Sequence, residues 1–184
     1  MDTVGDRLGL RPGQACVDIG CGYGSTARRL AVTRGVRVTG FTLSAEQGRY
    51  AAAHPEPGVE IQLRDWLANG LADASADAAW AIESSEHMVN KPRFFAEAHR
   101  VLAPGGRFVI CAWLAETGAS GWKVRHLLSR SAARGACARW ARARSMRRWP
   151  WRRALRSPAM RMSAAASPAP GKSTQQKPTD RTPA

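Results

Sequence analysis

The feature that most constrains this chain is a run of three glycines, Gly20, Gly22 and Gly24, directly after the apolar segment Ala15–Ile19. That segment is rich in β-forming residues and follows Pro12-Gly13, so it is predicted to be a buried strand. Glycines at every second position after a strand leave the backbone bare, which allows a ligand to approach it closely. The pattern indicates either a nucleotide-type binding loop or a tight turn without a ligand.

Apolar periodicity alternates between strand and helix from residue 15 to residue 113. We expect strands at 15–19, 36–41, 59–63, 78–82 and 108–113, and helices at 25–33, 44–53 and 92–102. Ser25 and Ser44 stand at the starts of two of these helices and are candidate N-caps. Because parallel neighbours need a crossover of about a dozen residues, this order predicts an α/β fold, a doubly wound and mostly parallel sheet with helices on both faces.

The formal net charge of +14 is concentrated at one end of the chain. Residues 1–128 hold 14 Lys and Arg against 13 Asp and Glu, whereas residues 129–184 hold 14 basic residues and the single acid Asp180. Arg, Ala and Trp dominate after residue 128, and Ala, Ser, Pro, Gly, Gln and Thr dominate from Ser163. We expect one folded domain over 1–128, with its core at 12–114, and a largely disordered basic tail over 129–184.

The cysteines and the hydropathy pattern bear on compartment and partners. Cys16, Cys21, Cys111 and Cys137 show neither CxxC spacing nor a neighbouring His cluster, so neither a disulfide framework nor a metal site is predicted. No stretch reaches the roughly 20 apolar residues that span a bilayer, and the first residues lack a basic start followed by an apolar run. These features predict a cytoplasmic protein without a membrane span, and they indicate no oligomeric state.

An acidic residue, Asp18, stands two positions before the glycine run, in the sequence Val17-Asp18-Ile19-Gly20-Cys21-Gly22-Tyr23-Gly24. A dinucleotide fingerprint usually runs GxGxxG, whereas an acid two positions before GxGxG resembles motif I of class I S-adenosylmethionine (SAM) methyltransferases. The resemblance implies a Rossmann-like methyltransferase fold with SAM as its cofactor. It also implies that Asp18 orients the turn and the cofactor's amino acid end, and that the turn, Cys21 included, accommodates the methionine and ribose parts.

The end of the second predicted strand departs from the usual Rossmann pattern. An acidic residue about 20 positions after the first glycine commonly holds the ribose hydroxyls, but this chain has Thr42 there. Residues 40–47, G-F-T-L-S-A-E-Q, instead resemble the G-(I/L/F)-T-L-S-x-x-Q segment of the tocopherol methyltransferase and cyclopropane fatty acid synthase branch. This resemblance implies cofactor contacts from Thr42, Leu43 and Gln47, in which hydroxyl and amide groups replace the carboxylate.

Three later segments resemble the same branch, in the expected order. At Arg64-Asp65-Trp66 the resemblance implies that Asp65 accepts the adenine amino group and that Trp66 packs on the ring; a surface loop with an anchoring Trp is the alternative. Residues 79–88, A-W-A-I-E-S-S-E-H-M, look like the W-(A/S)-(I/M)-E-S-x-E-H-M signature of gamma-tocopherol methyltransferase-like enzymes, with Glu83 at the cofactor. Residues 101–107 match the vLkPGG turn before the fifth strand.

Methyl transfer asks little of the protein beyond alignment, because the sulfonium already makes the methyl group electrophilic. For a phenol or hydroquinone acceptor, a carboxylate or imidazole near the ring hydroxyl can act as general base. Glu83, Glu86 and His87 are the candidates by position, and His87 is equally well explained as a structural histidine. By resemblance, we expect methyl transfer to a small, hydrophobic acceptor.

Both ends of the chain depart from the family pattern. Class I methyltransferases carry an N-terminal helical cap and continue past the fifth strand to a sixth and an antiparallel seventh; neither is recognisable here, so we expect the sheet to lack its last strands. Residues 121–128 still resemble the family, whose members continue with an E-P-I-C-R-E-G-R-L-like stretch. A change of reading frame just after Leu128 would explain the altered composition, and the coding DNA decides this hypothesis.

Two alternatives to a small-molecule enzyme stay open. Trp140, Trp149 and Trp151 are interleaved with arginines over residues 139–156, as in RNA-binding segments, which would indicate an RNA-modifying methyltransferase. No RNA-binding module motif accompanies this charge, so the sequence disfavours a nucleic-acid partner. A sheet without its last strands could also be an inactive remnant that at most binds SAM.

Overall fold

The computed structural model describes residues 3–112 and 161–165 of the chain. The elements in these ranges are, in chain order, α1 (Thr3–Leu8), β1 (Ala15–Ile19), α2 (Ser25–Arg34), β2 (Arg37–Thr42), α3 (Ala45–Ala53), β3 (Val59–Leu63), the 3-10 helix η1 (Trp66–Ala68), β4 (Ala76–Ile82), the 3-10 helix η2 (Ser85–His87), α4 (Lys91–Val101), β5 (Leu102–Cys111) and β6 (Arg161–Ala165).

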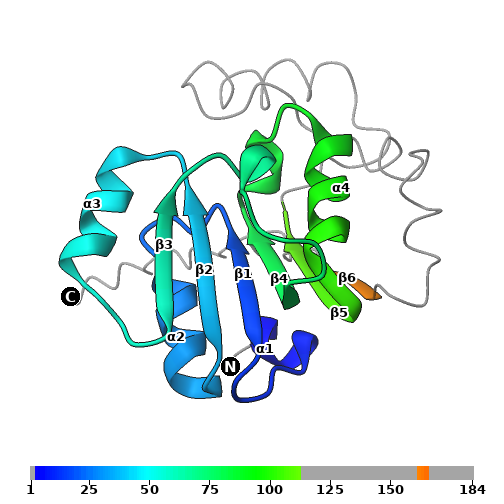
Figure 1. The fold of residues 1–184 in the computed structure, drawn as a ribbon, viewed down its shortest axis with the longest axis horizontal. Helices are drawn as coiled ribbons and strands as arrows, with labels where there is room; N and C mark the ends of the chain where they lie inside the picture. Colours follow the sequence, from blue (N-terminus) through cyan, green and yellow to red (C-terminus); the bar gives the residue numbers. More distant parts are fainter. Residues whose placement is uncertain (1–2, 113–160, 166–184) are drawn as a thin grey trace, which may run out of the picture.

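The six strands form one sheet in the order β3-β2-β1-β4-β5-β6, and each neighbouring pair is parallel (Figure 1). From β1 the chain moves outward through β2 to β3, and then crosses to the other side of β1 to form β4 and β5. The strand order therefore reverses between β1 and β4, and doubly wound sheets bind ligands beyond the carboxyl ends of their strands at such a reversal. The predicted doubly wound α/β fold is confirmed.

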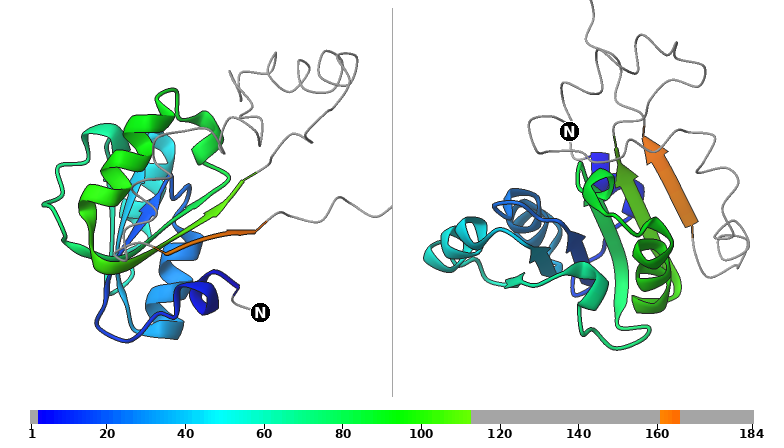
Figure 2. Two further views of the ribbon diagram at one scale, coloured as in Figure 1. Left: turned by 90° about the vertical axis from the view of Figure 1, so that its right-hand side faces the viewer. Right: turned by 90° about the horizontal axis from the view of Figure 1, so that it is seen from above.

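Helices cover both faces of the sheet, so the apolar core is divided in two (Figure 2). On one face, α4 and η1 pack against the strands through side chains such as Phe94 and Trp66. On the opposite face, α1 and α2 contribute Leu8 and Leu30. Because successive side chains of a strand point to opposite faces, the central strands β1 and β4 supply residues to both cores and are buried on both sides.

Local signals in the sequence explain where the helices begin and end. The Ser44 hydroxyl accepts a hydrogen bond from Gln47 N at 3.3 Å and caps α3, as predicted. The Asn90 side chain caps α4 in the same way, and Pro92 occupies the first turn of that helix, where a missing N–H costs nothing. Helix α2 ends at Gly35, which has a φ of 64° and lies in the left-handed region typical of helix ends.

The predicted cap Ser25 is wrong. The N-cap of α2 is Gly24, which has a φ of 78° and no side chain, and Ser25 is the first helical residue. Sequence patterns favour Ser over Gly at such a position, but here the glycine turn extends directly to the start of the helix. The short helix α1 was also missed, since six residues are too few to show helical periodicity.

The sheet continues past β5, where no further strand was predicted. Arg161–Ala165 forms β6, which pairs in parallel with β5 from Arg107↔Arg161 to Cys111↔Ala165. The expectation of disorder from Ser163 is therefore wrong for Ser163–Ala165. Pairing at a sheet edge is made by main-chain groups, so a short segment without apolar alternation can still supply a strand. The boundary at Leu128, the proposed change of frame and the Trp/Arg segment lie outside the described residues.

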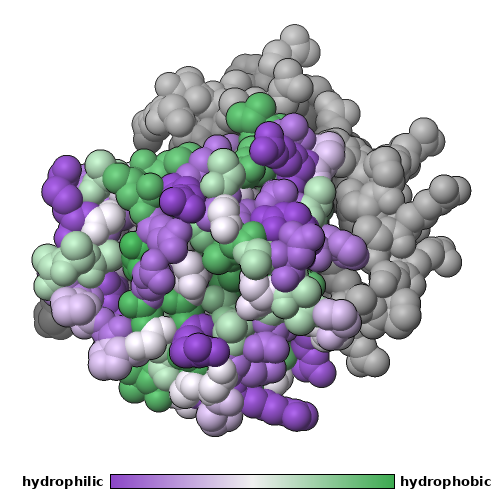
Figure 3. All heavy atoms as spheres, in the orientation of Figure 1, coloured by the Kyte–Doolittle hydropathy of each residue, from purple (hydrophilic) through white to green (hydrophobic). Residues whose placement is uncertain are grey.

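The surface of the described part shows hydrophilic and hydrophobic residues interspersed (Figure 3). Large apolar side chains are exposed at several separate places, among them Leu43 and Val89. Within residues 3–112 and 161–165, no helix has the length and the apolar character needed to cross a membrane.

Candidate functional site

A cavity of about 370 Å³ opens beyond the carboxyl ends of β1, β2 and β4, where the strand order reverses. Its walls come from the glycine turn, the β2–α3 turn, the loop after β3 and the loop after β4. The lining residues are Gly20, Gly22, Phe41, Thr42, Leu43, Gln47, Arg64, Asp65, Trp66, Ile82, Glu83, Ser84, His87 and Met88. A volume of this size falls in the range of roughly 300 to 1,000 Å³ usual for small-molecule sites.

The structure brings most of the predicted site residues to this one cavity. Those that line it are Gly20, Gly22, Thr42, Leu43, Gln47, Asp65, Trp66, Glu83 and His87. Asp18, Cys21, Gly24 and Glu86 are not among its lining residues. The lining residues that sequence reasoning missed are Phe41, Arg64, Ile82, Ser84 and Met88. Each of these five directly precedes or follows a predicted residue. Phe41, Arg64, Ile82 and Ser84 lie at or just after the ends of strands, so the rule that strand ends line such a site would have found them, whereas Met88 follows η2.

The three glycines of the turn are required for three different reasons. A Cβ at Gly20 would collide with the Cβ of Ser84, so this glycine allows the ends of β1 and β4 to approach each other. A Cβ at Gly22 would meet no atom within 4 Å, and Gly22 lines the cavity, so its missing side chain leaves room for a ligand. Gly24, the N-cap of α2, has a φ of 78°, a conformation that residues with a side chain rarely adopt.

Asp18 lies beneath the turn and is 2% exposed. Its register partner across the sheet is Trp80 of β4. Asp18 Oδ2 and Trp80 Nε1 have no hydrogen-bond partner among the described residues. The nearby Trp80 indole lowers the pKa of Asp18, but by less than burial raises it. Burial dominates and raises the pKa of Asp18 from its ordinary 3.8 to about 7. A side chain so enclosed supports the turn from below and does not reach the cavity.

Cys21 also lies behind the cavity wall. Its backbone N–H donates to Phe41 O at 2.9 Å, which ties the turn to the end of β2. Its side chain packs against Gly40, where an added Cβ would lie 3.0 Å from the thiol sulfur. Burial raises the pKa of the thiol to about 12, so it is a neutral packing group at physiological pH.

The end of β2 forms a small hydrogen-bonded cluster on the cavity wall. The Thr42 hydroxyl donates to Gln47 Oε1 at 2.6 Å and accepts from Ser44 N at 3.1 Å. Both Thr42 and Gln47 line the cavity. Their link fixes a hydroxyl and an amide where related folds place a carboxylate, and the Gln47 amide nitrogen has no hydrogen bond within the described part of the chain.

The loop after β3 places Asp65 and Trp66 in different environments. Asp65 is exposed, lines the cavity and caps η1 through a 2.9 Å bond from Leu67 N to Oδ1. Trp66 is 2% exposed; its indole packs on Phe41 and donates from Nε1 to Phe94 O at 3.3 Å. The indole is thus anchored in the core, as in the alternative reading of this segment, and only a small part of Trp66 borders the cavity.

The loop after β4 carries the three candidate catalytic residues. Glu83 has a φ of 49°, unusual for a residue with a side chain, and its N–H donates to Cys111 O at 2.8 Å. Glu83 and His87 line the cavity, whereas Glu86 is buried in η2, where the Ser85 hydroxyl donates to its carboxylate at 3.4 Å. Strained backbone of this kind costs about 1 to 3 kcal/mol and is concentrated at functional sites.

Comparison with known proteins assigns the chain to a family. The sequence profile of a family described as "Methyltransferase domain" matches residues 17–110, half of the 184-residue chain. The chain therefore belongs to this family, and its fold and motifs place it among the class I SAM-dependent methyltransferases. Its similarity to tocopherol methyltransferases and to a cyclopropane synthase confirms the branch that the motifs indicated.

The relatives that carry this assignment are named for several methyl acceptors. The chain is 38% identical over 106 residues to 2-methyl-6-phytyl-1,4-hydroquinone methyltransferase of Synechocystis, covering 56% of this chain and 33% of the relative. It is 40% identical over 116 residues to a probable chloroplastic tocopherol O-methyltransferase of Oryza sativa, covering 60% and 32%. Among solved structures, geranyl diphosphate C-methyltransferase from Streptomyces coelicolor, bound to S-adenosyl-L-homocysteine, matches with 29% identity and a TM-score of 0.66, covering 79% of this chain and 55% of that one. The chain thus spans about a third of the length of these two curated relatives.

Proposed function

We propose that this chain binds SAM in the cavity beyond β1, β2 and β4 and transfers its methyl group to a small, hydrophobic acceptor. The observation that carries the proposal is the open space at Gly22, bordered by the Thr42–Gln47 pair and by Asp65. These groups follow the order in which the family motifs contact the cofactor. They also lie at the strand-order reversal, where this fold binds its ligands.

The chemistry of the lining groups fits the parts of SAM. Gly20 and Gly22 leave room for the methionine and ribose parts, and the Thr42–Gln47 pair offers a hydroxyl and an amide to the ribose hydroxyls. Asp65 has one carboxylate oxygen engaged with Leu67 N, so the other is available to accept from the adenine amino group. Trp66 supports this end of the site from within the core, since its indole is buried.

When bound, SAM supplies an electrophilic methyl group that passes to the acceptor, which loses a proton, and leaves S-adenosylhomocysteine. Alignment of the acceptor with the methyl–sulfur bond provides most of the acceleration. Glu83 and His87 border the cavity and are the residues that could take the proton. Glu86 is buried beside them in η2, where its carboxylate accepts from the Ser85 hydroxyl, and it is the third candidate.

Two further properties belong to this proposal. The relatives named above are methyltransferases of small molecules, which supports such an acceptor over RNA. The free thiols of Cys16, Cys21 and Cys111 agree with the reducing cytoplasm as the compartment.

Calorimetric titration of the purified chain with S-adenosylhomocysteine tests the binding half of the proposal. We expect saturable 1:1 binding by the wild-type chain. A chain that unfolds cooperatively and still shows no affinity for this ligand or for SAM contradicts the assignment. A folded chain that binds but does not turn over any phenol or hydroquinone acceptor supports the inactive-remnant alternative instead.

The catalytic half is tested by Glu83→Gln, Glu86→Gln and His87→Asn, each assayed at saturating SAM. A general base contributes about 10²- to 10⁴-fold to the rate, so its removal should lower kcat at saturating SAM by at least the smaller factor. A variant with unchanged turnover removes that residue from the mechanism.

A further inference from the structure

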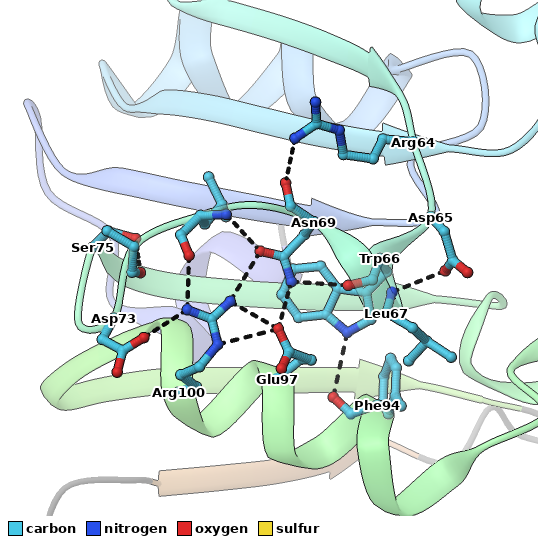
Figure 4. Close-up of polar contacts among 12 residues, drawn as sticks. Arg64, Asp65, Trp66, Leu67, Asn69, Asp73, Ser75, Phe94, Glu97 and Arg100 are labelled. Carbon is cyan, nitrogen blue, oxygen red and sulfur yellow. Dashed lines mark hydrogen bonds and ion pairs between the residues drawn. The ribbon is translucent and has the colours of Figure 1, made fainter.

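Asn69 is a buried polar residue that the proposed mechanism does not use, and it lies at the centre of a hydrogen-bond network beside the cavity (Figure 4). It is 1% exposed, yet its side chain makes every bond that an amide of this size can be expected to make in a core. Nδ2 donates to Trp66 O at 2.8 Å and to Glu97 Oε2 at 2.9 Å. Oδ1 accepts from Leu71 N at 2.8 Å and from Arg100 Nη2 at 3.3 Å.

Two charged residues of α4 hold this amide in place. Glu97 Oε2 accepts both from Asn69 and from Arg100 Nη2, the latter at 2.8 Å. The hydrogen bond from Arg100 is the main reason that the pKa of Glu97 is lowered. Arg100 Nη1 in turn donates to Leu71 O and to Asp73 Oδ1, both at 2.7 Å. The β3–β4 connection is therefore fastened to α4 by ionised groups, whose hydrogen bonds are stronger than those of neutral pairs.

The same network fixes the segment that borders the cavity. The Arg64 guanidinium donates from Nη1 to Asn69 O at 3.0 Å, so it closes the segment 64–69 into a compact loop. Trp66 is held at two points, through its carbonyl by Asn69 and through its indole Nε1 by Phe94 O. Asp65 lies between these anchors, and its own side chain caps the next turn of the loop. Asp65 and Asn69 thus belong to one loop whose ends are tied together, and no hydrogen bond within the described residues joins their two side chains.

We propose that Asn69 is a positioning residue for cofactor recognition, which sets the place of Asp65 toward the amino group of the adenine base. This inference rests on the proposed function, because it assumes that the base lies at Asp65. Without the Asn69 amide, Trp66 O and Leu71 N lose buried partners, and the Glu97–Arg100 pair loses the group that connects it to the loop. The loop then shifts or fluctuates, and a hydrogen bond that depends on Asp65 is lost first, since such bonds weaken steeply with distance and angle.

The test compares two ligands that differ at the edge of the purine in question, at the 6-substituent and in the proton on N1. S-adenosylhomocysteine carries the 6-amino group, and S-inosylhomocysteine has an oxo group in its place. A hydrogen bond to a charged group is worth about 1.5 to 3 kcal/mol, so the wild-type chain should prefer the amino ligand by on the order of 10- to 100-fold. We expect Asn69→Ala to reduce this preference to a few-fold or less, as Asp65→Asn does directly, while the variant keeps measurable affinity for both ligands.

Two controls separate positioning from general damage. Ser75→Ala removes a hydrogen bond from the same connection, Ser75 Oγ to Ala72 O, that does not involve Asn69 or Arg100, and it should keep the full preference. If Asn69→Ala does not fold, Glu97→Gln provides a milder change, because glutamine retains one oxygen acceptor for the network. We expect this variant to show a preference for the amino ligand between those of the wild type and Asp65→Asn. Hydrogen–deuterium exchange of residues 64–68 without any ligand should rise in Asn69→Ala and stay unchanged in Ser75→Ala.

Each outcome decides the inference. The inference is overturned if Asn69→Ala binds both ligands as the wild type does. It is also overturned if the variant loses affinity for both ligands by the same factor. A folded wild-type chain that binds neither ligand overturns the proposed function. In that case the role of Asn69 is tested by hydrogen–deuterium exchange of the ligand-free chain. If exchange at residues 64–68 is the same in Asn69→Ala as in the wild type, Asn69 does not fix the loop.

Discussion

Asp18 makes the stability of this fold depend on pH, in a direction opposite to that of most carboxylates. Burial raises its pKa to about 7, whereas in the unfolded chain it has its ordinary value of 3.8. Between these two values the folded state holds a proton that the unfolded state has released, so the free energy of unfolding falls as the pH rises. Each pKa unit corresponds to about 1.4 kcal/mol, and the loss from pH 4 to above pH 7 is therefore about 4 kcal/mol.

Asp18→Asn removes this titration and keeps the shape of the side chain. Urea unfolding followed by circular dichroism, repeated from pH 4.5 to 8.5, should show most of this decrease in the wild-type chain and its absence in Asp18→Asn. The matched control is Glu46→Gln, which removes an exposed carboxylate from the first turn of α3 and should leave the decrease in place. The reasoning is refuted if the wild-type free energy is level across this range, or if Asp18→Asn falls as steeply as the wild type.

Three other substitutions test the turn and the loop that border the cavity. Gly22→Ala places a methyl group in the open space and strains a φ of 57°, so calorimetry should show affinity for S-adenosylhomocysteine reduced at least 10-fold, with a loss of only about 1 to 2 kcal/mol in stability. Gly20→Ala should mainly destabilise the fold, because its Cβ would collide with Ser84; a variant with wild-type thermal stability would contradict this. Trp66→Ala removes a buried indole and its bond to Phe94 O and should cost about 3 to 5 kcal/mol in urea unfolding, whereas a cost below 1 kcal/mol would mean that the indole is not part of the core.

Much of the fold could be predicted because its signals are local and repeated. The five predicted strands overlap β1 to β5, although β5 begins at Leu102 and so includes the Pro104-Gly105-Gly106 segment that was expected to be a turn. Helix α4 has Phe94, Phe95, Ala98 and Val101 buried, as its spacing predicted. The site could be predicted because parallel strands bring their carboxyl ends together. Residues as far apart in sequence as Gly22 and His87 line one cavity for this reason.

Features that depend on direction or on distant partners could not be predicted. The sequence places Trp66 beside Asp65, but its contacts with Phe41 and Phe94, which are distant in sequence, hold the indole in the core, while Asp65 lines the cavity. In the sequence, Asn69 resembles an ordinary turn residue. Its role could not be predicted, because its partners Glu97 and Arg100 lie 28 and 31 positions further along the chain. Strand β6, R-M-S-A-A, has no apolar alternation, and the backbone pairing that joins it to β5 leaves no mark in the sequence.

Gly20 and Ser84 are 64 positions apart in the sequence, but they lie so close together that the size of one side chain limits the other. The Ser84 hydroxyl also donates to Ile19 O, so this side chain occupies the space that a residue larger than glycine would need. Exchanging the first turn for that of another protein, or the β4 loop alone, would therefore pair surfaces that were not shaped for each other. A functional graft between such domains has to carry both segments together, and a random library that varies only one of them should return glycine at position 20 in nearly every folded clone.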